Sequence, residues 1–314
     1  MLLGVDIGGT KCALIVSGDD GKILSREAAL TSDVDKTLGW ITEGAKRIAE
    51  KYEIKAVGIS CGGPLDSIKG TINCPPNLPD WDRVPITKLL SEVTGAPAFL
   101  CNDANACALA EWKYGAGKGS RNMIFLTFGT GLGAGLILDG RLYEGTNGMA
   151  GEAGHIRLAN DGPVGYGKRG SFEGFCSGGG IARLGAAMIE ASGEYPDWCP
   201  DRESLKNLTA KTIAEKAKAG DPVAIKIYDA SAEKLGLGLS ILMDLFNPER
   251  IVIGSVFARS EELFRGTMER VIAREALAET AQVCQVVPAA LGDAIGDYAA
   301  IAVASRGLEE MKNV

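Results

Sequence analysis

The chain has 314 residues, of which 46% are hydrophobic, with a formal net charge of −7 and a pI near 5.0. This acidic balance leaves no excess of positive charge to neutralise phosphates, so we expect no nucleic-acid partner. The single histidine, His155, excludes zinc sites that are built from several histidines.

The sequence contains no apolar run of about 18 residues, and Asp6 comes too early for the apolar region of a secretory signal. We therefore expect no membrane partner and a soluble, cytoplasmic protein. The eight cysteines lie mostly in apolar segments and form no CxxC pair, which favours buried free thiols.

The first part of the chain predicts the element order βββαβαβα. Turn residues at Gly8-Gly9 and at 18–21 separate three short apolar strands, after which helical and strand-like spacing alternate. The expected strands are 2–7, 12–17, 22–28, 56–60 and 98–101, and the expected helices are 34–52, 86–94 and 104–114.

A second strand, glycine turn and strand follow the small residues 115–120, at 123–128, 129–133 and 135–138, with a further strand at 141–143. This order repeats the opening pattern and predicts two α/β lobes with a cleft between them. We place the lobes at 1–118 and 119–297, with a C-terminal helix, about 298–314, able to pack back on the first lobe.

The remaining sequence alternates long helices with short strands. The expected strands are 156–158, 250–253 and 284–287, and the expected helices are 180–191, 210–219, 223–245, 261–274 and 293–311.

Both glycine turns are candidate phosphate loops, because glycine lets backbone N–H groups approach an anion closely. The first contains Gly8, Gly9, Thr10 and Lys11, and the second contains Gly129, Thr130, Gly131 and Gly133. An ordinary hairpin turn is the alternative for the first. A strand rather than a helix follows the second, so it is not a Rossmann turn, and no GxxxxGKS or GxxxxGKT loop occurs.

Two acidic residues stand at the ends of predicted strands. Asp6 lies beside the first glycine turn and could hold Mg²⁺ directly or through water, or it could cap the turn. Asp103 stands after the strand 98–101, where open α/β folds bind ligands. It could instead cap the following helix, but Asn102 can fill that position.

Glu152 and His155 lie three residues apart among glycines and alanines, and Glu173 follows before a run of glycines at 178–180. A lone histidine is often structural, but small neighbours leave room for a ligand. Several acceptors that converge on one small molecule suit a polyhydroxyl ligand such as a sugar.

Together these segments resemble the ROK family (repressors, open reading frames and sugar kinases), within the superfamily of actin, the heat-shock ATPases and hexokinase. The resemblance rests on VDIGGTK (5–11), PNLPDW (76–81), NDAN (102–105), GTGLG (129–133), GEAGH (151–155) and NPERIVIG (247–254). It extends over nearly the whole chain.

The resemblance implies a duplicated ribonuclease-H-like, actin-like ATPase fold that binds ATP and a monosaccharide, with Asp103 as the catalytic base. The residues implied to bind the sugar are Gly63, Asn77, Asn102, Asp103, Glu152, His155 and Glu173. Those implied to bind the nucleotide phosphates are Asp6, Gly8, Gly9, Thr10, Lys11, Gly129, Thr130, Gly131 and Gly133, and those near the adenosine are Gly178, Gly179 and Gly254.

The chain departs from the family in one segment. The family commonly has CxCGxxGCxE after the histidine, and its three cysteines bind structural zinc with that histidine. Here Val164, Tyr166 and Ser171 stand at those positions, so we predict no zinc and a loop held by packing of Tyr166 and Phe172. Gly254-Ser255 stands where the family commonly has a Gly-Gly pair near the nucleotide.

The predicted function is ATP- and Mg²⁺-dependent phosphorylation of a hexose or N-acetylhexosamine, similar to a glucokinase or fructokinase. A sugar-sensing repressor of the family is a rival, but a strand that begins at Leu2 leaves no place for a helix-turn-helix module before it. A non-catalytic sugar-binding protein and an ATPase acting on protein or acyl substrates are the other rivals. The resemblance also admits a homodimer.

Overall fold

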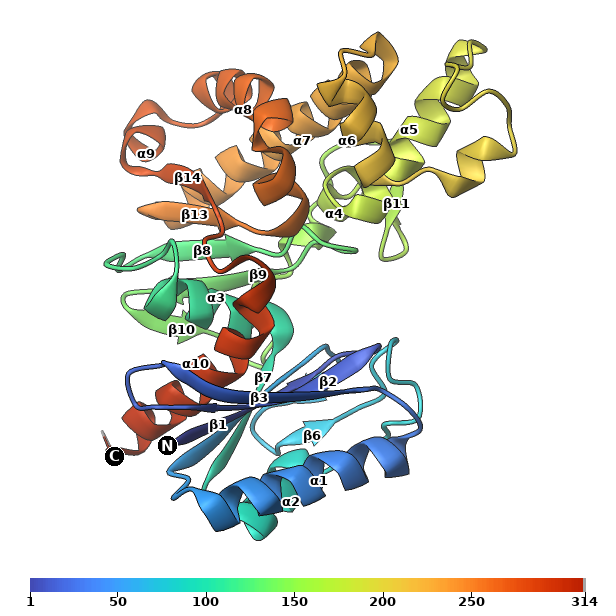
Figure 1. The fold of residues 1–314 in the computed structure, drawn as a ribbon. Coiled ribbons are helices and arrows are strands. Elements are labelled where there is room, and N and C mark those ends of the chain that lie inside the picture. Colours follow the sequence, from blue (N-terminus) through green and yellow to red (C-terminus); the bar gives the residue numbers. More distant parts are fainter. Residues whose placement is uncertain (313–314) are drawn as a thin grey trace. The chain divides into compact units, whose positions relative to one another are not determined.

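The structure is a computed structural model that describes residues 1–312. Contacts between residues divide the chain into two compact units (Figure 1). Unit 1 comprises Met1–Gly119, Leu142–Ala150 and the segment from Ala290 onward, and unit 2 comprises Ser120–Arg141 and Gly151–Ala289. Residues 313 and 314, the end of the expected C-terminal helix, lie outside the described residues.

Unit 1 is built on a five-stranded mixed sheet with the order β3-β2-β1-β4-β7. The first three strands form the predicted antiparallel meander, and β1, β4 and β7 run parallel. The strands are β1 (Leu2–Ile7), β2 (Lys11–Ser17), β3 (Ile23–Leu30), β4 (Ala56–Cys61) and β7 (Ala98–Asn102), with a small hairpin of β5 (Leu65–Asp66) and β6 (Thr71–Ile72).

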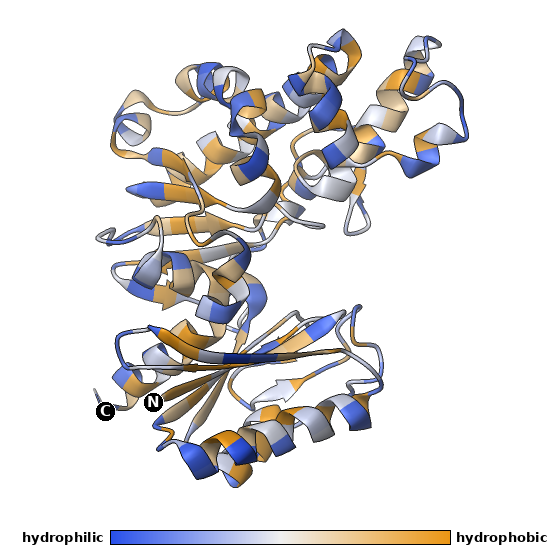
Figure 2. Cartoon of the chain, viewed as in Figure 1, coloured by the Kyte–Doolittle hydropathy of each residue, from blue (hydrophilic) through white to orange (hydrophobic). Residues whose placement is uncertain are grey.

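Helices cover both faces of this sheet, which explains why β4 is buried along its whole length and reads as a continuous apolar run. The helices are α1 (Val34–Lys51), α2 (Ile86–Thr94), α3 (Asp103–Tyr114) and α10 (Ile295–Lys312), the last preceded by the short helix η3 (Gly292–Ala294). Alternate residues of β1 serve the two faces: Leu3 packs in a cluster with residues of α1 and α2, whereas Leu2 packs with Ile301 of α10. Figure 2 shows hydrophobic colours along these central strands.

Helix α10 lies so close to the sheet that only glycine fits beneath it. A Cβ atom added at Gly58 of β4 would lie 2.1 Å from the carbonyl oxygen of Ala300 and 2.3 Å from the nitrogen of Ala304. A Cβ atom at Gly4 of β1 would lie 3.0 Å from the Cβ of Ala300. The backbones of helix and strands are therefore in direct contact.

Unit 2 repeats this design with the sheet order β10-β9-β8-β13-β14. Its strands are β8 (Met123–Leu126), β9 (Ala134–Leu138), β10 (Arg141–Tyr143), β13 (Arg250–Ile253) and β14 (Gln285–Pro288). The strand β8 pairs antiparallel with β9 and parallel with β13, as β1 does with β2 and β4. The prediction of a duplicated, ribonuclease-H-like α/β fold is confirmed.

An aromatic cluster joins two long helices of unit 2, α7 (Pro222–Phe246) and α8 (Ser255–Glu275). Its centre is Phe264 of α8, whose ring centroid lies 5.1 Å from that of Tyr228, 5.4 Å from that of Phe128 and 5.7 Å from that of Phe257. The helices are α4 (Phe172–Phe175), α5 (Gly178–Ser192), α6 (Ala210–Lys218), α7 (Pro222–Phe246), α8 (Ser255–Glu275) and α9 (Ala278–Val283), with short helices η1 (Ala153–His155) and η2 (Ser204–Asn207).

Two predictions about unit 2 need correction, and two short helices were missed. The strand expected at 156–158 does not form; Arg157 makes only an isolated bridge with Ser171, next to a hairpin of β11 (Val164–Gly165) and β12 (Lys168–Arg169). Helix α8 begins at Ser255 rather than 261 and is kinked at Ser260. The short helices α4 and α9 were not predicted, because elements of four to six residues leave little periodic signal.

None of the helices formed by residues 1–312 combines the length and the apolar character that crossing a membrane requires.

The close approach of α10 predicts that a larger residue at position 58 destabilises the protein. Gly58→Ala should lower the free energy of unfolding by about 1–3 kcal/mol or more, because its new methyl group would meet backbone atoms that cannot rotate away. A methyl group at Gly39, in α1, would have no atom within 4 Å, so Gly39→Ala should instead raise stability by about 0.5–1 kcal/mol. Urea unfolding of both variants measures this difference, and equal effects would contradict the packing.

Candidate active site

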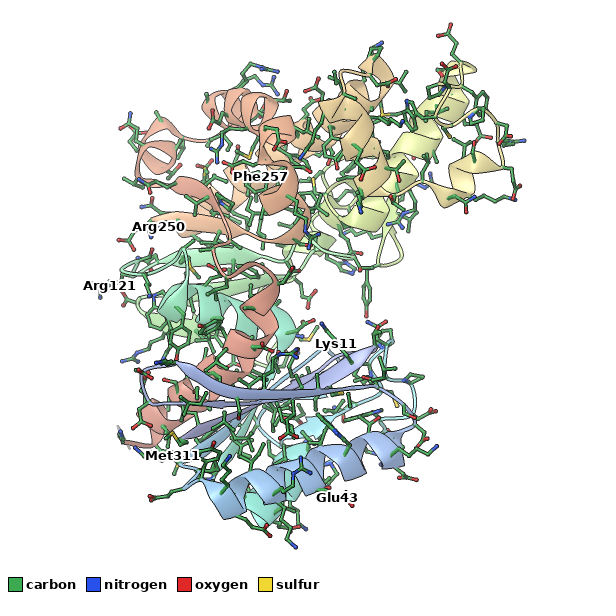
Figure 3. The ribbon with its side chains drawn as sticks, viewed as in Figure 1. Lys11, Glu43, Arg121, Arg250, Phe257 and Met311 are labelled. Atoms are coloured by element: carbon green, nitrogen blue, oxygen red, sulfur yellow. The ribbon has the colours of Figure 1, made fainter. Side chains whose placement is uncertain are left out.

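The first glycine turn joins β1 to β2 and packs against the loop that carries Asn77. Gly9, Thr10 and Lys11 are exposed, and the N–H of Gly8 donates to the carbonyl of Lys11 at 3.0 Å. A Cβ atom at Gly9 would lie 2.6 Å from the Cβ and 2.8 Å from the carbonyl oxygen of Asn77. The structure therefore brings together the predicted phosphate turn and a predicted sugar residue, and Figure 3 shows Lys11 at the start of β2.

Asp6 lies at the end of β1, beside this turn, in a partly buried position. Burial is the main reason that its pKa is raised from 3.8 to about 6, and the negative charges of Asp297 and Asp103 add to the effect. Lys11 and Arg26 oppose it. Asp6 and Asp103, predicted from separate motifs, are thus electrostatic neighbours.

Asp103 is the first residue of α3 and is exposed. The side chain of Asn102 caps the helix by accepting from the N–H of Ala104 at 3.0 Å, as expected, and the same N–H lies 2.8 Å from Oδ1 of Asp103. The second carboxylate oxygen, Oδ2, lies 3.8 Å from the place of a Cβ atom at Gly62, and the amide of Asn102 lies 3.2 Å from the place of one at Gly63. A side chain at Gly63 would therefore crowd the amide of Asn102.

Helix α10 also lies against Asp6, which was not predicted from the sequence. A Cβ atom at Gly296 would lie 2.7 Å from Oδ2 of Asp6, so the helix must present a glycine here. The next residue, Asp297, accepts from Nε of Arg26 at 3.0 Å and 2.8 Å with its two oxygens. Arg26 and Asp297 are 271 positions apart, so the sequence offers no local signal that would pair them.

In unit 2 the second glycine turn is tied to Glu173. The carboxylate of Glu173 accepts from the N–H of Leu132 at 3.0 Å. A Cβ atom added at Gly131 would lie 2.7 Å from Oε2 of Glu173. Gly133 donates to the hydroxyl of Thr127 at 2.8 Å, which closes the turn. The turn and the predicted sugar carboxylate therefore form one rigid arrangement.

His155 and Glu152 approach the same arrangement through η1. A Cβ atom at Gly154 would lie 2.2 Å from the carbonyl oxygen of Leu132 and 3.3 Å from the Cβ of Glu173. Glu152 is exposed at the start of η1, and His155 is half-buried at its end. The structure thus brings the three predicted sugar residues of unit 2 together around the glycine turn.

The residues assigned to the adenosine also border that turn. The N–H of Gly178 donates to the carbonyl of Gly129 at 2.7 Å, and a Cβ atom at Gly179 would lie 3.6 Å from the carbonyl oxygen of Thr130. Gly254 follows β13 as the N-cap residue of α8, and Ser255 comes next with a positive φ of 49°. The hydroxyl of Ser255 lies 4.0 Å from the place of a Cβ atom at Gly129. The N-termini of α5 and α8 therefore both border the turn.

The segment that replaces the cysteine-containing loop is held by hydrogen bonds. The hydroxyl of Ser171 caps α4 by accepting from Gly174 and also contacts the carbonyl of Gly165. The backbone of Gly170 accepts from Leu158 at 2.9 Å, and Phe172 is completely buried. Val164 offers no ligand atom, so these residues do not fit a zinc ion. Among residues 1–312, no group of three or more histidine, cysteine or carboxylate side chains could hold a metal.

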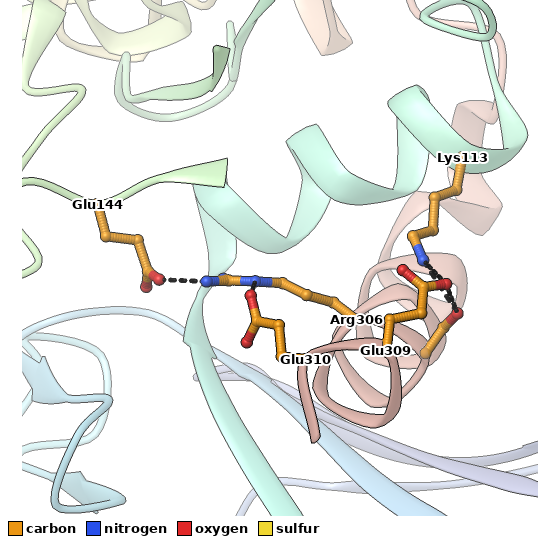
Figure 4. A network of polar contacts seen from close by, with 6 residues as sticks. Lys113, Glu144, Arg306, Glu309 and Glu310 are labelled. Atoms are coloured by element: carbon orange, nitrogen blue, oxygen red, sulfur yellow. Dashed lines mark hydrogen bonds and ion pairs between the residues drawn. The ribbon is translucent and has the colours of Figure 1, made fainter. Parts of the chain in front are cut away.

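The segments of unit 1 that adjoin unit 2 in the sequence are held by side chains of unit 1. The buried carboxylate of Glu111 in α3 accepts backbone N–H groups of Ala116 at 2.7 Å, Leu291 at 2.9 Å and Ala290 at 3.2 Å. In Figure 4, Arg306 of α10 bridges Glu144 at 2.7 Å and Glu310 at 2.7 Å, next to the contact of Lys113 with Glu309. Glu144 belongs to the short segment that precedes Gly151 and Glu152.

Comparisons with known proteins identify the family of the chain. The sequence model of the ROK family matches residues 2–306. The chain is 36% identical to a glucokinase of Streptomyces coelicolor over 263 residues, which is 81% of each chain. It is similar to a ROK family glucokinase of Streptomyces griseus, solved in complex with glucose and AMPPNP, with 33% identity, a TM-score of 0.77 and coverage of 98% of this chain and 99% of that one.

A xylose repressor of Caldicellulosiruptor bescii is 30% identical over 282 residues, which is 86% of this chain and 69% of the repressor. The fold and the two glycine turns define a protein of the actin and hexokinase class. The chain belongs to the ROK family, and its relatives place it with the sugar kinases of that family.

The raised pKa of Asp6 makes stability depend on pH. The carboxyl group of Asp6 stays protonated up to about pH 6 in the folded protein, but only up to about pH 3.8 in the unfolded chain. The stability that this protonated group contributes is therefore complete below pH 3.8 and is lost as the pH rises through 6. Asp6→Asn lacks the titration, and its stability relative to the natural protein should increase by about 1–3 kcal/mol between pH 4 and 7.

Chemical unfolding of both proteins across this pH range provides the measurement. Asp35→Asn, which removes an exposed carboxylate in the first turn of α1, is the control for the loss of one negative charge. A stability difference between Asp6→Asn and the natural protein that does not change with pH would contradict the raised pKa of Asp6.

The composition of the loop from 156 to 173 predicts that the stability of the protein does not depend on zinc. A zinc-selective chelator should leave the melting temperature unchanged, because hydrogen bonds and buried Phe172 hold this segment and neither Val164 nor Tyr166 is a zinc ligand. Differential scanning fluorimetry with the chelator, and again with added zinc, measures this. A fall in melting temperature that zinc reverses would refute it.

Proposed function

We propose that the chain is an ATP-dependent kinase that transfers a phosphoryl group to a hydroxyl of a hexose or N-acetylhexosamine, with glucose as the first candidate. Its membership of the ROK family and its 36% identity to a glucokinase support this substrate class. The observation that carries the proposal is the position of Asp103, an exposed carboxylate at a strand end beside Asp6 and the first glycine turn.

Asp103 acts as the general base in this proposal. In this role a carboxylate oxygen of Asp103 accepts the proton of the sugar hydroxyl as that hydroxyl oxygen attacks the terminal phosphate of ATP. Phosphoryl transfer needs little covalent chemistry from the protein, so most of the rate comes from positioning. Asn77, Asn102, Gly63, Glu152, His155 and Glu173 bind the sugar in the same proposal.

The nucleotide is assigned to the glycine-rich segments. Gly8, Gly9, Thr10 and Lys11 and the turn of Gly129, Thr130, Gly131 and Gly133 bind phosphates, while Gly178, Gly179 and Gly254 border the adenosine. The exposed N–H groups of such turns suit an anion. The AMPPNP bound to the similar glucokinase supports an ATP site.

Mg²⁺ fits Asp6. A single carboxylate at the edge of a phosphate turn suits an ion that keeps several waters and takes its other ligands from phosphates. When bound, the ion offsets negative charge on the phosphates. Asp6 must be ionised to bind it, and its pKa of about 6 leaves it ionised at neutral pH.

A non-catalytic sugar-binding regulator is the second candidate, because a xylose repressor matches the chain at 30% identity. It would use the same sugar residues without consuming ATP. A cytoplasmic location and a homodimer stay predictions from the sequence.

The two candidates differ in ATP consumption over a panel of sugars. Glucose, mannose, fructose, allose, N-acetylglucosamine and N-acetylmannosamine should be tested with ATP and Mg²⁺ in a coupled assay, with sugar binding measured in parallel by calorimetry. A kinase consumes ATP with at least one sugar. Binding without turnover favours the regulator, and neither binding nor turnover refutes both.

Asp103→Asn should lower kcat by about 10²–10⁴-fold while the sugar still binds, because the amide keeps the shape of the side chain but cannot accept the proton. The control is Asp35→Asn, which should retain normal kinetics because Asp35 lies on the surface of α1. Near-normal turnover by Asp103→Asn would remove Asp103 from the role of base.

A further inference from the structure

Tyr166 occupies an unfavourable position at the tip of the β11–β12 hairpin. Its side chain is 72% exposed and its φ is 44°, and Gly167 follows with a φ of 75°. Two positive φ values define the two-residue hairpin turn that favours Asn-Gly or Asp-Gly, and a bulky residue with a positive φ is strained. Neither burial nor turn geometry explains an aromatic residue here.

A second hairpin of unit 2 shows what this turn requires. Between β9 and β10, Asp139 has a φ of 57° and Gly140 a φ of 72°, so the same backbone turn is made by the preferred Asp-Gly pair. Tyr166 therefore contributes something that the turn itself does not need. Residues that break a local rule in this way are expected at functional sites.

The side chain of Tyr166 contacts the only histidine. The ring centroids of Tyr166 and His155 are 5.4 Å apart with an interplanar angle of 78°, an edge-to-face contact. Lys168, two residues further along the hairpin, donates to the carbonyl oxygen of His155 at 2.5 Å. One hairpin thus contacts both the backbone and the imidazole of His155.

The base of the hairpin is fixed to the helix that carries Glu173. A Cβ atom at Gly165 would lie 2.5 Å from the nitrogen of Gly174, and the hydroxyl of Ser171 contacts the carbonyl of Gly165 at 3.3 Å. Because the base cannot shift relative to α4, the ring of Tyr166 has a defined place from which to restrict the imidazole.

We propose that Tyr166 is a positioning residue for His155, and that its ring fixes the imidazole in the orientation that binds a sugar hydroxyl. The inference rests on the proposed function. A ring that is oriented before binding loses less rotational freedom when the sugar arrives. From the usual strength of an aromatic contact, removal of the ring should weaken sugar binding by about 3- to 10-fold.

Two variants separate this role from a structural one. Tyr166→Phe keeps the ring and serves as the matched control. Tyr166→Asn removes the ring but places at this site a residue that accepts a positive φ, so the hairpin should keep or gain stability. Because His155 is the only histidine, tag-free protein gives a single set of imidazole NMR signals that reports the contact directly.

We expect Tyr166→Asn to shift the His155 signals, to raise the sugar KM by about 3- to 10-fold with kcat changed by less than about twofold, and to leave the melting temperature equal or higher. Tyr166→Phe should match the natural protein in all three. An unchanged KM, unchanged His155 signals or a lowered melting temperature in Tyr166→Asn would each overturn the proposal. If no sugar of the panel shifts the His155 signals of the natural protein, the proposed function fails, and this role with it.

Discussion

The close contact between α10 and the central strands of unit 1 is the constraint on which the candidate base and metal site depend. Gly4 and Gly58 let the helix backbone rest on β1 and β4, and Gly296 then brings the start of the helix against the carboxylate of Asp6. The burial that results, together with the charge of Asp297, raises the pKa of Asp6. A packing requirement in the sheet therefore sets the charge state of a side chain at its edge.

Much of the fold, and the neighbourhood of Asp103, could be predicted from the sequence because the signals were local. The pairing of Asn102 as cap with Asp103 beside it, and the repetition of strand, glycine turn and strand, depend on residues that are neighbours in the chain. The contacts of Asp297 with Arg26 and of Glu111 with Leu291 join distant positions, so no local pattern could reveal them. The strand expected at 156–158 is reduced to one bridge, because its pairing with the segment around Ser171 does not extend beyond Arg157.

The hairpin after His155 shows how one constraint can replace another. Where the family commonly has metal ligands, this chain has a serine that caps a helix, a buried phenylalanine next to that serine, and a surface tyrosine against the imidazole. Hydrogen bonds and an aromatic contact are individually weaker than metal coordination, but several of them act on one short segment. We therefore expect the surroundings of His155 to be ordered without an ion.

The discontinuous make-up of unit 1 has a consequence for biosynthesis. Its sheet is complete once residue 102 has been made, but the face covered by Ile301 and Ala304 stays open until the last described helix emerges from the ribosome. All of unit 2 is translated before that helix. The nascent chain thus carries an uncovered apolar surface through most of its synthesis, which makes this interval the one in which chaperones and aggregation compete for it.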